Sequence, residues 1–326
     1  MEADLLDRFN RDLDALTLPG ARLGIAVSGG PDSLALLLLA AAARSTKIEA
    51  ATVDHALRTG SREEAEMVAH VCADLGVPHA ILTVQWDDKP ITAIQERARE
   101  ERYRLLADWA KDRKLDAVAT AHHLDDQAET LLMRLARGSG ARGLSGMRAA
   151  AAVPGSDIPL LRPLLGWRRA ELEQIVASAG LEPARDPSNE DGQFERIRIR
   201  RALAEADWLD PQALASTAAN LGQAEAALEW ATQQEWARAV TGGEAEIIYR
   251  PADAPPEIRR RIVARAVAGL ATEGEGADLR GRELDRLLSV LAASGKASLR
   301  GVLCSGGETW RFVPAPERTR PVDNLR

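Results

Sequence analysis

LGIAVSGGPDS, residues 23–33, sets the fold of this 326-residue chain. A short apolar run over residues 23–27 stops at Ser28-Gly29-Gly30, and a helical pattern begins at Ser33. Two glycines let the backbone approach a phosphate closely, and the N-terminus of the following helix presents free N–H groups and the positive end of its dipole. The hydroxyls of Ser28 and Ser33 can add donors. The stretch therefore predicts a strand, a phosphate-binding loop and a helix.

Pro31 and Asp32 complete this loop, and Asp32 is its unusual member. A carboxylate beside a polyphosphate is repulsive unless a cation lies between them, so we expect Asp32 to bind Mg²⁺. The GxxxxGK[ST] pattern of kinases and GTPases is absent, and no lysine follows the loop. The alternative is a plain strand–turn–helix junction in which Asp32 or a serine caps the helix.

Short apolar runs and helical segments alternate outward from the loop. We expect strands at 23–27, 48–53, 80–84 and 117–120, and helices at about 33–43, 61–75, 94–113, 125–137 and 168–179. This alternation predicts an α/β fold with a doubly wound, mostly parallel sheet of the Rossmann type. Ligands of such sheets bind at the carboxyl ends of the strands.

The chain changes character near residue 205, beyond which the pattern is helical and rich in alanine. We therefore expect a catalytic domain at 1–205 and a C-terminal, mainly helical extension at 206–326. Within the extension, residues 259–270 and 282–291 have a helical pattern, and the weak alternation at 295–313 is consistent with a hairpin.

The net charge of −7 argues against a protein that coats DNA without specificity. The charge is unevenly distributed, however: residues 257–326 hold 13 basic and 9 acidic residues, so RNA is not excluded. The longest apolar run, residues 34–43, is too short to span a bilayer, and the acidic N-terminus does not resemble a signal peptide. These features predict a soluble, cytoplasmic protein without a membrane partner.

Two further motifs follow the expected strands. Asp54 and His55 end the second strand, where the adenosine of a nucleotide commonly lies; alternatively, they satisfy a turn. Residues 120–130, TAHHLDDQAET, follow the fourth strand, and helical spacing puts Asp126, Glu129 and Thr130 on one face. Imidazoles and carboxylates that converge there could bind a metal or hold the ammonium group of an amine substrate.

Two segments rich in glycine or arginine come next. Residues 138–147, GSGARGLSGM, offer a mobile loop from Gly138 with a cation, Arg142, for phosphate; an ordinary linker is the alternative. Arg196, Arg198 and Arg200 alternate with isoleucines, and on a strand these arginines would share one face. We favour contact with tRNA or phosphate over a solvated edge.

These motifs carry a family resemblance. Residues 28–33 resemble the PP-loop of the N-type ATP pyrophosphatases, which cleave ATP to AMP and pyrophosphate through an adenylated intermediate. AHHLDDQAET followed by RLARGSGARGLSGM is similar to the lysidine synthetase branch of that superfamily. Further matches are DHALR at 54–58, QERAR at 95–99 with Arg102-Tyr103, RPLL at 162–165 and DPSN at 186–189. The resemblance covers about residues 20–205, although Ile197 stands where family members usually carry Asn.

The resemblance implies an ATP- and Mg²⁺-dependent ligase that modifies isoleucine tRNA with a CAU anticodon. ATP would adenylate the 2-carbonyl oxygen of the wobble cytidine, and the ε-amine of L-lysine would then attack that carbon and expel AMP. It also implies that Asp126 and Glu129 hold the lysine amine and that His122 orients the nucleotide or lysine. Arg99, Arg102 and Arg142 would pair with phosphate or tRNA. Family membership makes a homodimer plausible.

Rival hypotheses have specific weaknesses. A tRNA thiolation enzyme of the same superfamily normally needs paired cysteines, but the two cysteines, Cys72 and Cys304, lie far apart. A metal-dependent phosphohydrolase would explain the His and Asp residues but not SGGPDS. A nucleotide sensor would keep the loop without needing Asp126 and Glu129.

Overall fold

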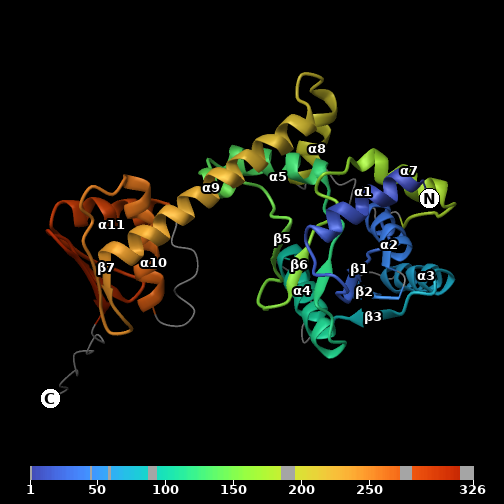
Figure 1. The fold of residues 1–326 in the computed structure, drawn as a ribbon, viewed down its shortest axis with the longest axis horizontal. Helices are drawn as coiled ribbons and strands as arrows, with labels where there is room; N and C mark the ends of the chain where they lie inside the picture. Colours follow the sequence, from blue (N-terminus) through green and yellow to red (C-terminus); the bar gives the residue numbers. More distant parts are fainter. Residues whose placement is uncertain are drawn as a thin grey trace, which may run out of the picture. The chain divides into compact units, whose positions relative to one another are not determined.

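The structure, a computed structural model, describes residues 2–44, 46–57, 60–86, 94–184, 195–271 and 281–315. Two compact units divide the chain, Met1–Gly222 and Gln223–Arg326, and Figure 1 labels their elements. The first unit extends past residue 205, where we expected the catalytic domain to end. Arg58 and the DPSN motif at 186–189 lie outside the described residues.

The first unit is built on a six-stranded sheet with the order β3-β2-β1-β4-β6-β5. The five strands from β3 to β6 are parallel, and β5 pairs antiparallel with β6 at one edge. The strands are β1 (Leu23–Ala26), β2 (Ile48–Asp54), β3 (His79–Thr83), β4 (Ala117–Ala119), β5 (Ala150–Ala152) and β6 (Pro159–Leu161). The mostly parallel sheet predicted from the sequence is confirmed.

Helices cover both faces of this sheet. The helices of this unit up to residue 205 are α1 (Ala3–Asp14), α2 (Pro31–Arg44), α3 (Ser61–Asp74), α4 (Ile94–Asp112), α5 (Leu124–Ala136), α6 (Ala141–Leu144), α7 (Arg169–Ser178) and α8 (Glu195–Glu205), of which α6 and α8 pack against α5. Successive strand residues point to opposite faces: Ala50 and Leu161 pack in the core beneath α1, α2, α3 and α7, whereas Ala51 and Leu160 pack in the core against α4. The doubly wound arrangement follows from these two cores.

Two apolar features fix the helices that carry the site. Leu34, Leu36 and Leu37 of α2 are fully buried, so this helix holds its N-terminus rigidly at the carboxyl end of β1. On the other face, Gly24 of β1 lies against the ring of Trp109 on α4, and a Cβ at Gly24 would come within 2.5 Å of that ring. The glycine therefore allows α4 to pack closely over β1.

The second unit combines helices with a five-stranded antiparallel sheet. The helices are α10 (Pro256–Leu270), α11 (Arg282–Ala292) and the C-terminal part of α9, which spans Pro211–Ala239. The sheet has the order β7-β8-β11-β10-β9, with β7 (Val240–Gly242), β8 (Ile247–Tyr249), β9 (Lys296–Leu299), β10 (Val302–Ser305) and β11 (Trp310–Pro314). The weak alternation after residue 295 does form strands, whereas β7 and β8 were not predicted.

None of the helices in the described ranges is long and apolar enough to cross a lipid bilayer. This agrees with the absence of a long apolar run in the sequence.

Candidate active site

The Gly-rich loop joins β1 to α2 and is held together by the side chain of Ser33. The Ser33 hydroxyl donates to the carbonyl oxygen of Gly30 at 2.9 Å and accepts the backbone N–H of Ser28 at 3.1 Å. Gly29 has a φ of +86°, a left-handed conformation that favours glycine. The residues between β1 and α2 thus form a closed turn over the N-terminus of α2.

This loop opens onto a cavity of about 1130 Å³ at the carboxyl ends of the parallel strands. Its walls come from the loop, the end of β2, α4, the segment after β4, and α8. The predicted site residues that line it are Ser28, Gly30, Pro31, Asp32, Ser33, His55, Arg99, Arg102, His122, Asp126, Arg196 and Arg200. Twelve residues selected from separate motifs therefore meet in one place. Gly29, Asp54, Glu129, Gly138, Arg142 and Arg198 are not among its lining residues.

Asp54 organises a turn instead of facing the cavity. Its Oδ1 accepts the backbone N–H of Ala56 at 2.9 Å and the hydroxyl proton of Ser61 at 2.6 Å, so it ties the end of β2 to the start of α3. His55, the next residue, lines the cavity. Burial and the charge of Arg102 lower the pKa of His55, which favours the neutral imidazole at neutral pH.

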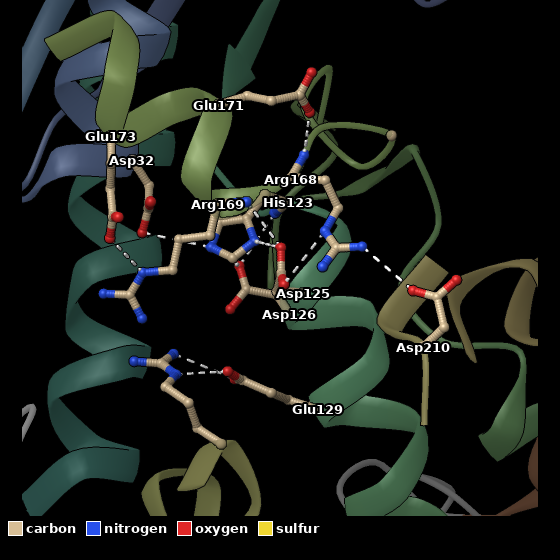
Figure 2. Close-up of polar contacts among 12 residues, drawn as sticks. Asp32, His123, Asp125, Asp126, Glu129, Arg168, Arg169, Glu171, Glu173 and Asp210 are labelled. Atoms are coloured by element: carbon tan, nitrogen blue, oxygen red, sulfur yellow. Dashed lines mark hydrogen bonds and ion pairs between the residues drawn. The ribbon is translucent and has the colours of Figure 1, made fainter. Parts of the chain in front are cut away.

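His123 is the hub of the acidic cluster, and Figure 2 shows its ring among three carboxylates. Its Nε2 lies 3.5 Å from Oδ2 of Asp32 and 3.6 Å from Oδ2 of Asp126, and its Nδ1 lies 3.7 Å from Asp125. Burial acts to lower the pKa of His123, but these carboxylates together raise it above its usual value. His123 thus links the Gly-rich loop to the N-terminus of α5.

Asp126 is ionised and faces the cavity. Burial acts to raise its pKa, but the neighbouring His123, Arg196 and His122 hold the pKa of Asp126 below its usual value. Its Oδ2 also accepts the backbone N–H of His123 at 3.1 Å, at the first turn of α5. A carboxylate that stays charged in this position can hold a cation, because its negative charge is already stabilised.

His122 is neutral at physiological pH. Burial, together with the positive charges of Arg162, Arg102 and Arg196, lowers its pKa to about 4, although Asp126 opposes the shift. Its Nδ1 lies 2.9 Å from the hydroxyl oxygen of Thr120, which fixes the orientation of the ring. A neutral imidazole on the cavity wall can accept or donate a hydrogen bond to a ligand.

Glu129 lies behind Asp126 on the same face of α5, as the helical spacing predicts, and it is paired with α8. Its carboxylate, only 2% exposed, accepts from Arg200 at 2.6 Å and lies 3.3 Å from Arg196. The strand expected for the arginine run is wrong, because these residues form α8. On a helix, Arg196 and Arg200 are four residues apart and share a face, whereas Arg198 points elsewhere and is exposed.

A second cavity of about 460 Å³ lies next to this ion pair. Carboxylates line it at Asp125, Glu129, Asp207 and Asp210, and apolar residues line it at Leu203, Ala204, Ala206, Leu209 and Pro211. Arg169 and Arg200 line both cavities, so they form a shared wall. Arg169 is held there through its backbone N–H, which donates to Oδ2 of Asp125 at 2.8 Å.

The loop at 138–147 is anchored to α5. The Gln127 side chain bonds to both the carbonyl oxygen and the N–H of Met147, at 2.8 and 2.6 Å. Arg134 donates to the carbonyl oxygens of Gly143 and Gly146 at 2.6 and 3.0 Å. Arg142 is exposed on this loop. In this conformation neither Gly138 nor Arg142 reaches the cavity.

Sequence reasoning missed several residues of the site. The sequence gives no separate role to His123, because only the structure shows that this imidazole, and not His122, meets Asp32. Tyr103 and Arg162 were noted only as parts of matching motifs, and both are buried beside the cavity. Arg168 and Arg169 lie far along the chain from the acidic motif, so no local pattern could have connected them to Asp125.

The cysteines and the acidic residues bear on the rival chemistries. Cys72 and Cys304 are both buried, and burial raises the pKa of their thiols to about 11 and about 12, so neither is a reactive thiolate. In the part of the chain that the structure describes, no three His, Cys, Asp or Glu side chains are arranged to hold a metal between them. The burial and raised pKa of both thiols weaken the thiolation hypothesis.

Comparisons with known proteins agree with this geometry. Residues 5–207 match the family model described as a PP-loop domain. A tRNA(Ile)-lysidine synthase of Novosphingobium aromaticivorans is 48% identical over 312 residues, covering 95% of this chain and 94% of that protein. One from Zymomonas mobilis is 44% identical, covering 92% and 91%.

Among solved structures, a U34-tRNA thiolase from Methanococcus maripaludis with a [4Fe-4S] cluster superposes with a TM-score of 0.56. The match covers 68% of this chain and 80% of that chain, at 14% identity. At this identity the likeness shows a shared fold.

Proposed function

The chain belongs to the tRNA(Ile)-lysidine synthase family, and on this premise we propose how its residues divide the ATP-dependent ligation of lysine to isoleucine tRNA. The 2-carbonyl oxygen of the wobble cytidine, in a CAU anticodon, attacks the α-phosphate of ATP and releases pyrophosphate. The ε-amine of lysine, once its ammonium group has given up a proton to a carboxylate or to water, then attacks C2 of the activated cytidine. The bond between C2 and the oxygen of AMP breaks, AMP leaves, and lysidine is formed. Activation is needed because the carbonyl oxygen is a poor leaving group and AMP is a good one. The product pairs with A instead of G.

One observation carries this proposal: buried His123 joins Asp32 of the ATP loop to Asp126 of α5, and both carboxylates line one cavity. Asp32 and Asp126 both approach Nε2 of the same ring, at 3.5 and 3.6 Å. The step that releases pyrophosphate and the step that consumes the amine therefore occur around one point. A protein that only bound nucleotide would need the loop but not the ionised Asp126.

The Gly-rich loop binds the pyrophosphate end of ATP. Backbone N–H groups at Gly29 and Gly30 and the N-terminus of α2 face the developing negative charge. Asp32 fits Mg²⁺, because its Oδ1 is buried and has no hydrogen-bond partner among the described residues. Magnesium bound there would neutralise charge on the departing pyrophosphate. His55 lies at the end of β2, where the adenosine binds in sheets of this kind.

Asp126 holds the ammonium group of lysine before the second step. It is ionised, it lines the nucleotide cavity, and it lies next to the shared wall of Arg169 and Arg200. The second cavity suits the rest of the amino acid, since it offers apolar contacts for the aliphatic chain and arginines for the carboxylate. Glu129 keeps Arg200 in that wall and so supports lysine binding. His122 orients the base or the amine.

The remaining cations contact tRNA or phosphate. Arg99, Arg102 and Arg196 line the cavity through which the base enters, and Arg198 and Arg142 lie on the surface. The wobble base must leave its stack to reach the cavity. We assign catalysis to residues 1–205 and further tRNA contacts to residues 206–326, whose last 70 residues are net positive. Modification of tRNA by a homodimer in the cytoplasm completes the proposal.

Labelled lysine tests the reaction directly. The protein is incubated with ATP, Mg²⁺, radiolabelled lysine and an isoleucine tRNA transcript with a CAU anticodon, and we expect label on the tRNA together with pyrophosphate release. The matched control is the same transcript with U at the wobble position, which should remain unlabelled. Release of phosphate, or no label on the CAU transcript by protein that binds ATP, would contradict the proposal. Asp126→Asn should retain ATP binding and lose labelling.

A further inference from the structure

Two arginines on one wall of the nucleotide cavity, with a third behind them, lie near Tyr103. Arg99 and Arg102 come from α4, and their guanidinium carbons lie 4.9 and 5.4 Å from the centroid of that ring. Arg162 follows β6 directly, and the positive charge of Arg99 acts on both Arg102 and Arg162. Within the described ranges, no carboxylate is paired with any of the three, in contrast to Arg196 and Arg200. We call this group the Tyr103 cluster: Arg99, Arg102, Tyr103 and Arg162.

Two buried donors of the Tyr103 cluster have nothing to bind. Arg162 is only 8% exposed; one end of its guanidinium donates to the carbonyl oxygen of Arg148 at 2.7 Å, but its Nε has no acceptor in the described parts of the chain. Tyr103 is 2% exposed, and its hydroxyl likewise lacks a partner there. Buried polar groups without partners are rare in native proteins because each costs free energy.

The electrostatics point in the same direction. Burial lowers the pKa of both Arg102 and Arg162, and the charge of Arg99 adds to this shift, whereas the neighbouring Tyr103 opposes it. The folded protein therefore holds like charges close together and partly desolvated. An anion placed between them would relieve both the repulsion and the missing hydrogen bonds.

The cluster is distinct from the cradle of the Gly-rich loop. That loop follows β1, whereas Arg162 follows β6, and β4 lies between these strands. Two inter-strand steps correspond to about 10 Å along the sheet edge. Arg99, Arg102 and Tyr103 line the cavity beside Thr120 and His122, and Arg162 stands behind them. An anion bound there would lie on the side of the cavity away from the pyrophosphate.

We propose that the Tyr103 cluster is a second phosphate site, which takes a phosphate ester through Arg102 and the Tyr103 hydroxyl while Arg162 supplies positive charge from behind. This inference rests on the proposed function, which brings two sources of such an ester into the cavity. One is the backbone of the tRNA next to the wobble cytidine. The other is the α-phosphate of ATP. Guanidinium and phenol donors suit the tetrahedral oxygens of either.

Tyr103→Phe separates a binding role from a structural one. It removes a hydroxyl that has no partner in the free protein, so the thermal midpoint should stay the same or rise. If the hydroxyl donates to a phosphate, Tyr103→Phe should weaken binding of the ligand that carries this phosphate, tRNA or ATP, by about tenfold, since hydrogen bonds to charged groups are strong. A purely structural tyrosine would not combine an unchanged or raised thermal midpoint with a lower ligand affinity.

The experiment measures two affinities for each variant: isoleucine tRNA transcript without ATP, and Mg·ATP without tRNA. Tyr103→Phe and Arg102→Gln are compared with wild type and with Arg104→Gln, which removes a charge from an exposed position of the same helix. A loss of tRNA affinity with a smaller salt slope for Arg102→Gln assigns the site to the tRNA backbone. A loss of ATP affinity alone assigns it to the α-phosphate. Unchanged affinities for both ligands overturn the proposal.

Failure of this inference can be told apart from failure of the proposed function. If wild type labels the CAU transcript with lysine but the two variants bind both ligands normally, only the Tyr103 cluster is misassigned. If wild type does not label the transcript, the proposed function itself is wrong. Arg162→Gln is a secondary variant, read only where its thermal midpoint matches wild type, because its side chain is buried.

Discussion

Two buried glutamates, one in each unit, hold arginines in outwardly similar ways. Glu129 of the first unit pairs with Arg200 and Arg196, whose side chains are 35% and 41% exposed and line cavities. Glu225 of the second unit accepts two hydrogen bonds from Arg261, at 2.8 and 2.7 Å, and that arginine is only 13% exposed. The chemistry of the two pairs is the same, but their access to solvent differs.

The difference teaches what each pair can do. Arg261 is enclosed and also bonds to Glu257 on its own helix, at 2.8 Å, so it fastens α9 to α10 within the second unit. Arg200 has one side on Glu129 and another on open space, so it can meet a ligand without leaving its carboxylate. An enclosed pair contributes to stability, whereas a half-open pair presents a positioned charge.

The largest effect is expected where the enclosed pair is broken. Glu225→Gln leaves Arg261 buried and undercompensated, so hydrogen exchange should show the amides of α10 losing about 3 kcal/mol of protection. ATP affinity should not change. Glu229→Gln is the control, because that exposed carboxylate lies 3.8 Å from Arg261 and should cost less than about 0.5 kcal/mol. Equal effects of the two substitutions would remove the basis for the comparison.

The half-open pair should behave in the opposite way. In Glu129→Gln, water can reach both arginines, so the free energy of unfolding should fall by less than about 1 kcal/mol. Because Arg200 is no longer held in the shared wall, kcat/KM for lysine should fall about 100-fold, the cost of losing one preorganised charge in an active site. The measurement is steady-state labelling of tRNA at varied lysine. Glu195→Gln, which breaks a neighbouring surface pair with Arg137, should leave kcat/KM unchanged.

Local patterns in the sequence predicted most of the fold of the first unit, but they did not predict the arginines that pair with Glu129. The βαβ order, the loop at 28–33 and the shared face of Asp126 and Glu129 depend on neighbours a few residues apart, so periodicity predicts them. The partner of Glu129 is 71 residues away, and the alternation of Arg and Ile at 196–200 fits a strand as well as a helix. Only packing against α5 decides in favour of α8.

The second unit shows the same limit. Strands β7 and β8 have three residues each, too few for a period to be visible, and the pairing of β8 with β11 joins parts of the chain about 60 residues apart. The roles assigned to individual site residues stay predictions, including those of Arg142 and Gly138, which lie away from the cavity in this conformation.

The smallest expected effect is the pH dependence of stability, and it distinguishes the two units through their histidines. All five histidines lie between residues 55 and 123, so histidine-linked pH dependence belongs to that unit. His122 has a pKa of about 4 in the folded protein, against an ordinary value of 6.5, so the unfolded chain takes up its proton first as the pH falls. Its contribution is therefore neutral above about pH 6.5 and becomes destabilising between pH 6.5 and 4, by about 1 kcal/mol at pH 5.5.

His122→Gln should remove this loss. His123 acts in the opposite sense, because its pKa is raised and the proton it holds stabilises the folded state at low pH until the pH rises through that raised value. The pH dependence of the free energy of unfolding of the wild type therefore combines both histidines. Only the difference between wild type and His122→Gln isolates the contribution of His122. Urea unfolding at pH 7.5 and 5.5 should show a difference that grows at the lower pH. If the difference is the same at both values, folding does not lower the pKa of His122, and burial does not keep its imidazole neutral at pH 5.5.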